Sequence, residues 1–339
     1  MRIAQIASIN VSVPPERYGG TELIISLLTE ELVRRGHEVT LYATGDSKTS
    51  AKLSSYYPKA MGFGKDTPEK HLKASEFAFK DADQFDLIHN HVGTFGLKYA
   101  KTSKTPVLTT LHNDYLLPQK SSAFEEFKNT GSFVAISHDQ KKRSKGLNIA
   151  GVVYNAIEAE KYPLKEEKDG FLLFFGNLIK EKGIDVAVKT AQELKMKLII
   201  SGKADPGPQK DFFDREIKPH IDNKNIVLLP PVDQKTKIDL LSRAKCLLFP
   251  IAWNEPFGLA MIEAMACGTP VVAYNRGSVP EIVKDGVTGY VADNYEELLE
   301  AVAKLDKISP QTCRQHVEDN FNVKKMVDGY EALYKTWAV

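Results

Sequence analysis

The chain contains two successive series of short apolar segments, and this pattern limits its fold more than any other feature. Within each series, the apolar segments alternate with stretches whose hydrophobic residues recur at helical spacing. Residues 21–36 are an example, with Leu23, Leu27, Leu28 and Leu32 on one face. The alternation predicts an α/β fold in which parallel sheets carry helices on both faces. The predicted strands are residues 2–8, 38–43, 86–91, 106–112, 133–137 and 151–155, then 171–176, 197–202, 225–230, 245–250, 269–274 and 289–293.

The length of the chain predicts two domains. A chain of 339 residues exceeds what one hydrophobic core usually organises, and the apolar pattern restarts after a first series. Between the two series, residues 158–170 are charged and contain Pro163 and Gly170, as linkers often do. We therefore predict two doubly wound, Rossmann-like domains facing a cleft. The predicted bounds are 1–163 for the first domain, 164–320 for the second, and 321–339 for a final helix that packs back on the first.

The overall composition excludes several classes of protein. Hydrophobic residues make up 42% and charged residues 26%, as in globular proteins, and a net charge of +1 gives no reason to expect nucleic acid. No window approaches the ~20 apolar residues of a membrane-spanning helix, and the N-terminus lacks a signal-peptide pattern. The three cysteines form neither a metal-binding nor a disulfide pattern. We therefore predict a cytoplasmic protein that contacts at most the inner face of a membrane.

Two loops that directly follow predicted strands contain residues suited to bind anions. In residues 16–22, Gly19 and Gly20 permit close backbone approach, and the next helix begins with unpaired N–H groups. Lys180 and Lys182 follow the first strand of the second series, and their charge suits phosphate. The alternatives are a tight turn and a solvated loop. Because ligands of open parallel sheets bind beyond the C-terminal ends of the strands, both loops are candidates for ligand binding, and the residues alone leave these alternatives open.

The stretch NEPFGLAMIEAMACGTPVVAY, residues 254–274, contains two glutamates separated by seven residues. Pro256 suits the first turn of a helix, which places Glu255 outside the helix at its N-terminal end. Glu263 lies about two turns inside, among apolar residues, where a carboxylate needs a partner. The two acids are therefore expected to contact different parts of one extended ligand. The alternative is a capping acid followed by an ion-paired helix acid.

Three other polar clusters have less specific patterns. His89 and His91 alternate at a strand end, which predicts that they face opposite sides and do not share a metal. Asp81 and Asp83 match an Asp-x-Asp pattern that can hold a divalent metal, but they precede a strand, so we interpret them as a solvated helix end. A basic cluster predicts a solvated helix face, with anionic lipid as the alternative partner: Lys141, Lys142, Arg143 and Lys145.

Residues 254–291 resemble the signature of retaining glycosyltransferases of family 4, which have the GT-B fold. The similarity rests on the Glu-x₇-Glu spacing, the Pro-Phe-Gly that follows Glu255, and the strand sequence Gly-Thr-Pro-Val-Val. It extends to YGGTE in the first loop, EKG after the first strand of the second series, and VVYNAIEAEKYP at the domain junction. The resemblance therefore covers nearly the whole chain.

The resemblance implies a nucleoside-diphosphate sugar as donor, held mainly by the second domain. Glu263 would bind the ribose hydroxyls, Glu255 would bind the transferred sugar, and Lys182 would neutralise the leaving phosphate. No metal ion is expected, because a leaving phosphate oxygen would take the proton of the acceptor hydroxyl. The implied catalytic residues are His91, Lys182 and Glu255. The other implied donor contacts are Gly20 at the diphosphate or acceptor, Val232 at the base, and the backbone N–H groups of Phe257, Gly258 and Leu259.

The chain departs from the family pattern at two positions. Asn177 stands where the family has an arginine that serves as a second phosphate cation, and asparagine carries no charge. We hypothesise that Lys180, three residues later, takes over that charge while Asn177 still contacts the donor. Ala156 follows Asn155 where the family commonly has glycine, and an alanine there would be strained if the site needs a positive φ.

The favoured function is a hexosyltransferase that uses a UDP-sugar, with a GDP-sugar as the second candidate. One alternative is a nucleotide-sugar epimerase on the same fold, for which His91 is the only acid/base group identified. Another is a catalytically weak nucleotide-sugar-binding protein, suggested by Asn177. A lipid-linked glycan, a small metabolite and a natural product all remain as acceptors, bound by first-domain loops near residues 10–20, 45–75 and 112–130.

Overall fold

The computed structural model describes residues 1–16, 19–114, 116–117 and 122–337. Some positions of the predicted binding loops lie outside the described residues. They are Arg17 and Tyr18 in the first loop, and several positions of the acceptor loop predicted near residues 112–130.

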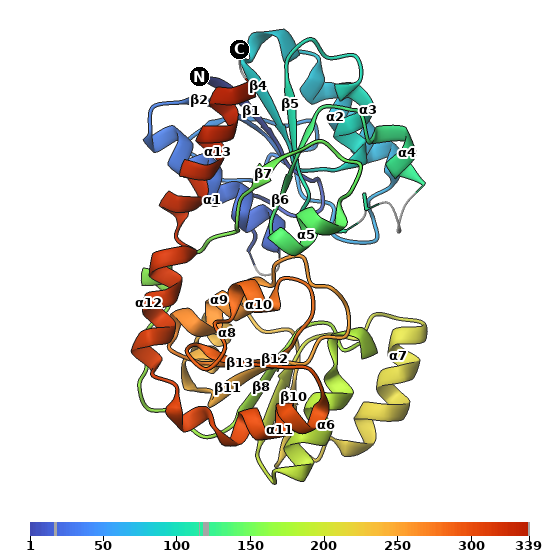
Figure 1. Ribbon diagram of the computed structural model, residues 1–339. Coiled ribbons are helices and arrows are strands. Elements are labelled where there is room, and N and C mark those ends of the chain that lie inside the picture. The colour runs from blue at the N-terminus through green and yellow to red at the C-terminus, as the bar shows by residue number, and fades with distance from the viewer. Residues whose placement is uncertain (17–18, 115, 118–121, 338–339) are drawn as a thin grey trace. The chain divides into compact units, whose positions relative to one another are not determined.

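The chain forms two compact units, each built on its own sheet (Figure 1). Unit 1 consists of Met1–Ala156 and Val323–Val339, and unit 2 consists of Ile157–Asn322. The first domain predicted from the sequence ends a few residues later than the first segment of unit 1. Those residues belong to unit 2, where the Tyr162 hydroxyl donates a hydrogen bond to Glu263.

Among the described residues, the sheet of unit 1 has seven strands in the order β3-β2-β1-β4-β5-β6-β7, all parallel. The winding direction reverses between β1 and β4, as in doubly wound folds. Its strands are β1 (Arg2–Ile6), β2 (Glu38–Tyr42), β3 (Lys52–Ser54), β4 (Leu87–Asn90), β5 (Val107–Thr110), β6 (Ser132–Ala135) and β7 (Ile149–Val152). The sequence does not predict β3, because this three-residue strand has one apolar side chain, Leu53.

Helices cover both faces of this sheet (Figure 1). Apolar strand residues such as Ile6 and Ile88 pack with Ala78 of α2 on one face, whereas Leu41 packs with Ile25 of α1 on the other. Helix α13 runs beside α1. The helices of unit 1 are α1 (Gly20–Arg34), α2 (Pro68–Phe79), α3 (Thr94–Ala100), α4 (Ala123–Phe127), α5 (His138–Arg143) and α13 (Val323–Trp337).

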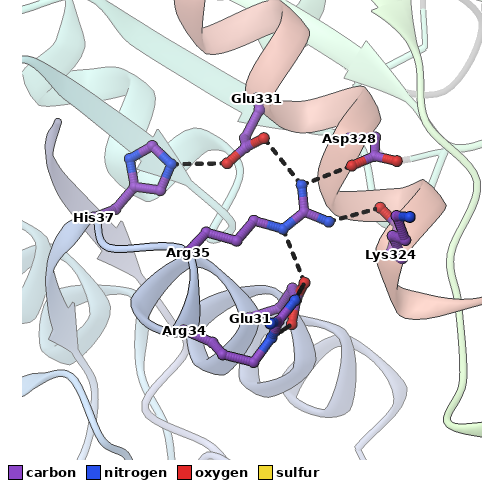
Figure 2. A network of polar contacts seen from close by, with 7 residues as sticks. All are labelled: Glu31, Arg34, Arg35, His37, Lys324, Asp328 and Glu331. Carbon is purple, nitrogen blue, oxygen red and sulfur yellow. Dashed lines mark hydrogen bonds and ion pairs between the residues drawn. The ribbon is translucent and has the colours of Figure 1, made fainter.

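Charged side chains join the end of α1 to α13 (Figure 2). The Arg35 guanidinium donates to Asp328 Oδ1 at 2.6 Å and to Glu331 Oε2 at 2.9 Å. A further guanidinium hydrogen bond, 3.1 Å long, goes to the backbone oxygen of Lys324. The other oxygen of Glu331 lies 2.8 Å from Nε2 of His37. Segments from opposite ends of the chain are thus joined within unit 1.

The sheet of unit 2 repeats the same winding with six parallel strands in the order β10-β9-β8-β11-β12-β13. Its strands are β8 (Leu172–Phe175), β9 (Leu198–Ser201), β10 (Ile226–Leu229), β11 (Cys246–Phe249), β12 (Val271–Tyr274) and β13 (Gly289–Ala292). Together with the sheet of unit 1, it confirms the predicted α/β class with two doubly wound sheets.

The helices of unit 2 also lie on both faces of their sheet. Alternate strand residues such as Leu172 and Phe174 pack with Ile184 of α6 and Leu298 of α11 in one apolar core, whereas α8 and α12 both contact α9. The helices are α6 (Ile184–Glu193), α7 (Pro208–Phe212), α8 (Gln234–Arg243), α9 (Leu259–Ala266), α10 (Val279–Ile282), α11 (Tyr295–Ala303) and α12 (Pro310–Asn320). Within the described ranges, no helix has the length and apolar character needed to cross a membrane.

Candidate functional site

The predicted donor-binding residues of unit 2 lie beyond the C-terminal ends of β8 and β11, except for Val232, which follows β10. These two strands are neighbours in the sheet and are the point at which its winding direction reverses. Loops at such a reversal are where open parallel sheets bind ligands. Lys182 ends a single 3₁₀ turn after β8, and Glu255 lies in the loop between β11 and α9. The fold therefore brings together residues that are far apart in the sequence.

Lys182 and Glu255 form an ion pair at this edge of the sheet. The Lys182 Nζ lies 2.8 Å from Glu255 Oε2, and the same oxygen accepts a 2.9 Å hydrogen bond from Trp253 Nε1. The ammonium also lies over the Trp253 ring, 4.4 Å from its centroid, and 5.8 Å from the centroid of Phe249. A cation is attracted to the faces of both rings. The carboxylate and the aromatic side chains thus hold this ammonium in a fixed place.

Two glycines allow the backbone to approach closely around this pair. Gly183 has φ 75°, and a Cβ there would lie 2.0 Å from the carbonyl oxygen of Pro250. Gly277 has φ 57°, and a Cβ there would lie 2.3 Å from the Glu255 nitrogen. L-residues rarely adopt these φ values, and the space is closed as well. Any side chain at either position would displace the segment that carries Lys182 or Glu255.

Helix α9 begins beside the ion pair, directly after Gly258, which has a left-handed conformation with φ 84°. Within the described part of the chain, the N–H groups of Gly258 and Leu259 have no hydrogen-bond acceptor. Helix N-termini carry partial positive charge and bind anions through such groups. Phe257 is buried, and its carbonyl oxygen accepts a 2.8 Å hydrogen bond from Ser278. An anion near Lys182 would therefore meet both an ammonium and backbone N–H groups.

Glu263 lies inside α9, is 2% exposed and has partners that the sequence does not predict. Its Oε1 accepts a 3.1 Å hydrogen bond from the Tyr162 hydroxyl. Its Oε2 forms an ion pair with the Nζ of Lys237 in α8, at 2.5 Å. Burial, followed by the charge of Glu263, raises the pKa of the Tyr162 phenol.

The other predicted donor residues of unit 2 also follow strands of the sheet, but they are not part of the Lys182–Glu255 ion pair. Asn177 is half-buried just after β8, where its carbonyl oxygen accepts a turn hydrogen bond from Ile179. Lys180 is exposed and lines an open depression together with Asp185 of α6. Val232 is half-buried between β10 and α8. The structure does not bring Lys180 or Val232 into contact with the Lys182–Glu255 pair.

Unit 1 contains the predicted glycine loop at the corresponding edge of its own sheet. Gly20 is the first residue of α1, and a Cβ on Gly19 would lie 2.8 Å from Glu22 Oε2. Glu22 is buried and accepts a 2.6 Å hydrogen bond from Ser8, and burial raises the pKa of its carboxyl group. Gly19 is therefore needed for the carboxylate to fold back against its own loop.

The prediction that His89 and His91 face opposite sides of the sheet is wrong. Strand β4 ends at Asn90, so His91 lies beyond it and the alternation of a strand no longer applies. The two rings lie 3.9 Å apart between centroids. His91 Nδ1 is 2.8 Å from Nε2 of His112, and His91 Nε2 is 2.6 Å from Oε1 of Gln5. Both ring nitrogens of His91 are therefore already hydrogen-bonded.

Burial keeps all three histidines of this cluster neutral at pH 7. The pKa values of His89 and His91 lie well below the usual 6.5, because burial disfavours the charged imidazolium and neighbouring histidines add to the effect. Burial lowers the pKa of His112 to about 4. Each imidazole therefore carries one proton, on one of its two nitrogens.

Sequence reasoning missed four residues that contact the predicted ones. His112 follows β5 as His91 follows β4, so the rule that points to residues just after strands could have found it. Trp253 lies two residues before Glu255, in the same loop. Tyr162 and Lys237 carry no such signal, because only the tertiary fold brings them to Glu263.

At the other departure from the family pattern, Ala156 does not have a positive φ, so no strain arises there.

Two protein-family models match the chain. "Glycosyltransferase Family 4" matches residues 18–161, and "Glycosyl transferases group 1" matches residues 156–320. Among the curated relatives is N-acetyl-alpha-D-glucosaminyl L-malate synthase of Bacillus anthracis. It is 24% identical to this chain, and the similarity covers 93% of each protein.

Several solved structures share the fold of this chain, among them AviGT4, a glycosyltransferase involved in Avilamycin A biosynthesis, with a TM-score of 0.74 and 22% identity over 99% of this chain and 98% of that one. Sucrose-phosphate synthase from Thermosynechococcus elongatus aligns with a TM-score of 0.81 and 19% identity, over 99% of this chain and 98% of that one. Anabaena Alr3699/HepE, solved in complex with UDP-glucose, aligns with a TM-score of 0.74 and 17% identity, over 99% and 100%. The fold is that of the GT-B glycosyltransferases. Because the two family models together span residues 18–320, the chain belongs to the family 4 type of glycosyltransferases, and the protein is a glycosyltransferase.

Proposed function

We propose that the protein moves a hexosyl group from a nucleoside-diphosphate sugar to an acceptor hydroxyl, with retention of configuration and without a divalent metal. A UDP-sugar is the favoured donor and a GDP-sugar the second candidate. The observation that carries the proposal is the Lys182–Glu255 ion pair, 2.8 Å long, at the N-terminus of α9. It places a cation and unpaired N–H groups, which suit a diphosphate, beside a carboxylate, which suits sugar hydroxyls.

The ion pair gives each partner a separate role once the donor binds. The Lys182 ammonium would turn from Glu255 to the diphosphate, where negative charge grows as the sugar leaves. The N–H groups of Gly258 and Leu259, with that of Phe257, would support the same charge. Glu255 would then accept hydrogen bonds from the sugar hydroxyls, while Trp253 still holds its Oε2. A leaving phosphate oxygen would take the proton of the attacking hydroxyl.

The remaining proposed contacts concern the nucleoside and the first unit. Glu263, whose Oε2 is paired with Lys237, would also accept a hydrogen bond from a ribose hydroxyl. Val232 would pack against the base. In unit 1, Gly20 would approach the diphosphate or the acceptor, and His91 would lie beside the sugar. The UDP-glucose complex of the Anabaena protein with this fold supports the choice of UDP.

A panel of donors tests the proposal. The protein is incubated separately with UDP-, GDP- and ADP-sugars, and we measure thermal stability and the release of nucleoside diphosphate. A donor at 100 times its Kd should stabilise the fold by about 2.7 kcal/mol. Slow hydrolysis to the nucleoside diphosphate is expected, whereas an epimer of the donor would indicate an epimerase. Binding without either product would indicate a nucleotide-sugar-binding protein, and no stabilisation by any donor would exclude the proposal.

The acceptor needs a second screen once a donor is known. Lipid-linked glycans, small metabolites and natural products are the classes to test, and the anomeric configuration of any product decides between retention and inversion. The basic cluster on α5 gives limited support for a membrane-bound acceptor. Its Arg143 is already hydrogen-bonded to Asp139 and paired with Asp114, so that part of the positive charge is neutralised within the protein.

A further inference from the structure

A row of polar side chains is buried between the sheet of unit 1 and helix α13. Gln5 of β1 and His89 of β4 are register partners on neighbouring strands, and Thr110 follows on β5. All three are at most 2% exposed, and two fully buried tyrosines of α13, Tyr330 and Tyr334, cover them. Buried polar groups are hydrogen-bonded in folded proteins, so each atom here must donate or accept.

The first half of the row runs from Gln5 to α13. The Gln5 Nε2 group donates to the Tyr334 hydroxyl oxygen at 3.2 Å, and that hydroxyl lies 2.6 Å from His89 Nδ1. His89 Nε2 lies 2.7 Å from Thr110 Oγ1, which in turn lies 3.1 Å from the Tyr330 hydroxyl. Because the Tyr334 oxygen accepts from the amide, its own proton goes to His89 Nδ1. The single proton of neutral His89 must then be on Nε2, where it bonds Thr110.

The second half of the row runs from Gln5 to the end of the sheet. The Gln5 Oε1 atom can only accept a hydrogen bond, so His91 Nε2, 2.6 Å away, must carry the proton of its ring. His91 Nδ1 is then an acceptor, and the proton of the 2.8 Å bond to His112 comes from His112 Nε2. This leaves Nδ1 of His112 without a proton. Among the described residues, it is also the only nitrogen of these three rings without a partner.

We propose that the Gln5 amide, with its Oε1 toward His91 and its Nε2 toward Tyr334, places the protons of His91 and His112 on Nε2 and so leaves His112 Nδ1 as an acceptor, and that Tyr334 is the positioning residue that couples this amide to His89. Seven side chains are linked by hydrogen bonds in which each group donates to the next one. Their order is His112, His91, Gln5, Tyr334, His89, Thr110 and Tyr330. The use of the free nitrogen, to accept a hydroxyl of the sugar or of the acceptor, rests on the proposed transfer of a hexosyl group. The proton pattern itself does not.

The opposite pattern is chemically complete and defines what would overturn the proposal. If the Gln5 amide were rotated by half a turn, its Nε2 would donate to His91, and Tyr334 would donate to its Oε1. Every bond in the row would then reverse, and the protons of His89, His91 and His112 would all be on Nδ1. His112 would present a donor instead of an acceptor. The two patterns therefore differ at three rings at once.

Nuclear magnetic resonance of protein labelled with ¹⁵N-histidine distinguishes the two patterns directly. The chain has 8 histidines, and His91→Gln and His112→Gln variants assign the two signals of interest. We expect an unprotonated Nδ1 and a protonated Nε2 for both rings at pH 7. Protonated Nδ1 in either ring would overturn the proposal, whatever the activity of the enzyme. This measurement needs no nucleotide sugar.

The matched variants Tyr334→Phe and Tyr330→Phe test the role of Tyr334. Each removes one hydroxyl from a fully buried residue of α13. Without the Tyr334 hydroxyl the Gln5 amide loses its link to His89 and to the rest of the row, so Tyr334→Phe should give mixed tautomers in His91 and His112, which it does not touch. Tyr330→Phe removes only the last bond of the row and should leave both tautomers unchanged. Equal effects of the two variants, or none from Tyr334→Phe, would contradict the proposal.

Kinetics provide the functional arm of the test. With a donor found by the panel, Tyr334→Phe should lower kcat about tenfold, the effect of one lost hydrogen bond, and leave the Kd for the free nucleoside diphosphate unchanged. Tyr330→Phe should lower kcat less. A wild-type enzyme that uses no nucleotide sugar would exclude the proposed function but not the proton pattern. Altered tautomers with unchanged kcat would show that the pattern has no part in catalysis.

Discussion

At the scale of single residues, the proposed chemistry of unit 2 depends on the Lys182 ammonium. A carboxylate oxygen and two aromatic rings surround it, so it is held in place without being deeply buried. Its partner Glu255 is half-buried as well. An ion pair that a ligand can reach can exchange one partner for the ligand at little cost. In the proposed reaction, Lys182 would therefore pair with Glu255 before the donor binds and with the diphosphate afterwards.

We expect Lys182→Met to lower kcat about 100-fold or more, because one preorganised charge at a leaving group contributes on that scale. Lys180→Ala should cause a smaller loss, because its exposed charge is screened by water. Lys189→Ala is the matched control, since Lys189 lines the same depression as Lys180 and lies over the Tyr295 ring. Initial rates with a saturating donor measure all three. Lys180→Ala with the turnover of the wild type would show that Lys180 does not replace the charge missing at Asn177.

The placement of Glu255 and the burial of Glu263 could both be predicted from the sequence, because Pro256 and the apolar neighbours are local signals. The partners of Glu263 could not. Tyr162 and Lys237 come from other elements, and nothing near them in the sequence marks them. The hydrophobic periodicity of one segment shows which of its residues are buried, but it does not show which residues of another segment they contact.

At the scale of elements, the same limit applies to whole helices and strands. The apolar strands were predictable, while β3, with one apolar residue, was not. The hydrophobic spacing near the C-terminus predicts a helix with a buried face. It does not show that two tyrosines of that face bond the polar side chains of β1, β4 and β5. Sequence patterns locate apolar faces well and give little information on polar pairing.

The contacts between α1 and α13 lead to a prediction about the docking of α13. Arg35→Leu should lower the free energy of unfolding by about 2 kcal/mol, because it removes charged hydrogen bonds to Asp328 and Glu331 from a side chain that is 15% exposed. Arg34→Leu is the control, since Arg34 is 71% exposed and pairs with Glu31 of its own helix. Urea unfolding of both variants measures the difference. Equal midpoints would mean that these bonds do not stabilise the docked helix.

At the scale of the whole molecule, each unit contains one of the two tryptophans of the chain. Trp253 lies in unit 2, and Trp337, the last residue of α13, lies in unit 1. The single-tryptophan variants Trp337→Phe and Trp253→Phe therefore report separately on the unfolding of unit 2 and unit 1. No external label is needed, and both reporters are native side chains.

We expect unit 1 to lose more stability than unit 2 as the pH falls from about 6.5 to about 4. His89, His91 and His112 have pKa values below 6.5 when folded, so below that pH the unfolded chain binds more protons and stability decreases. In unit 2, His316 shows the same direction of shift. Urea midpoints at pH 7 and pH 5 test this through the two tryptophans. Equal pH dependence of the two signals would contradict it.

The position of α13 has a consequence for how the protein is made. Ribosomes synthesise β1, β4 and β5 early, but the tyrosines that cover Gln5, His89 and Thr110 follow only after all of Ile157–Asn322. Unit 1 therefore stays incomplete throughout the synthesis of unit 2. The surface left open during that time includes amide, imidazole and hydroxyl groups, which water can solvate and which favour aggregation less than apolar ones do. Ribosome-bound chains stalled at Asn322 should accordingly be cut by protease within residues 1–156 yet remain soluble, and resistance to cleavage there would refute this order of assembly.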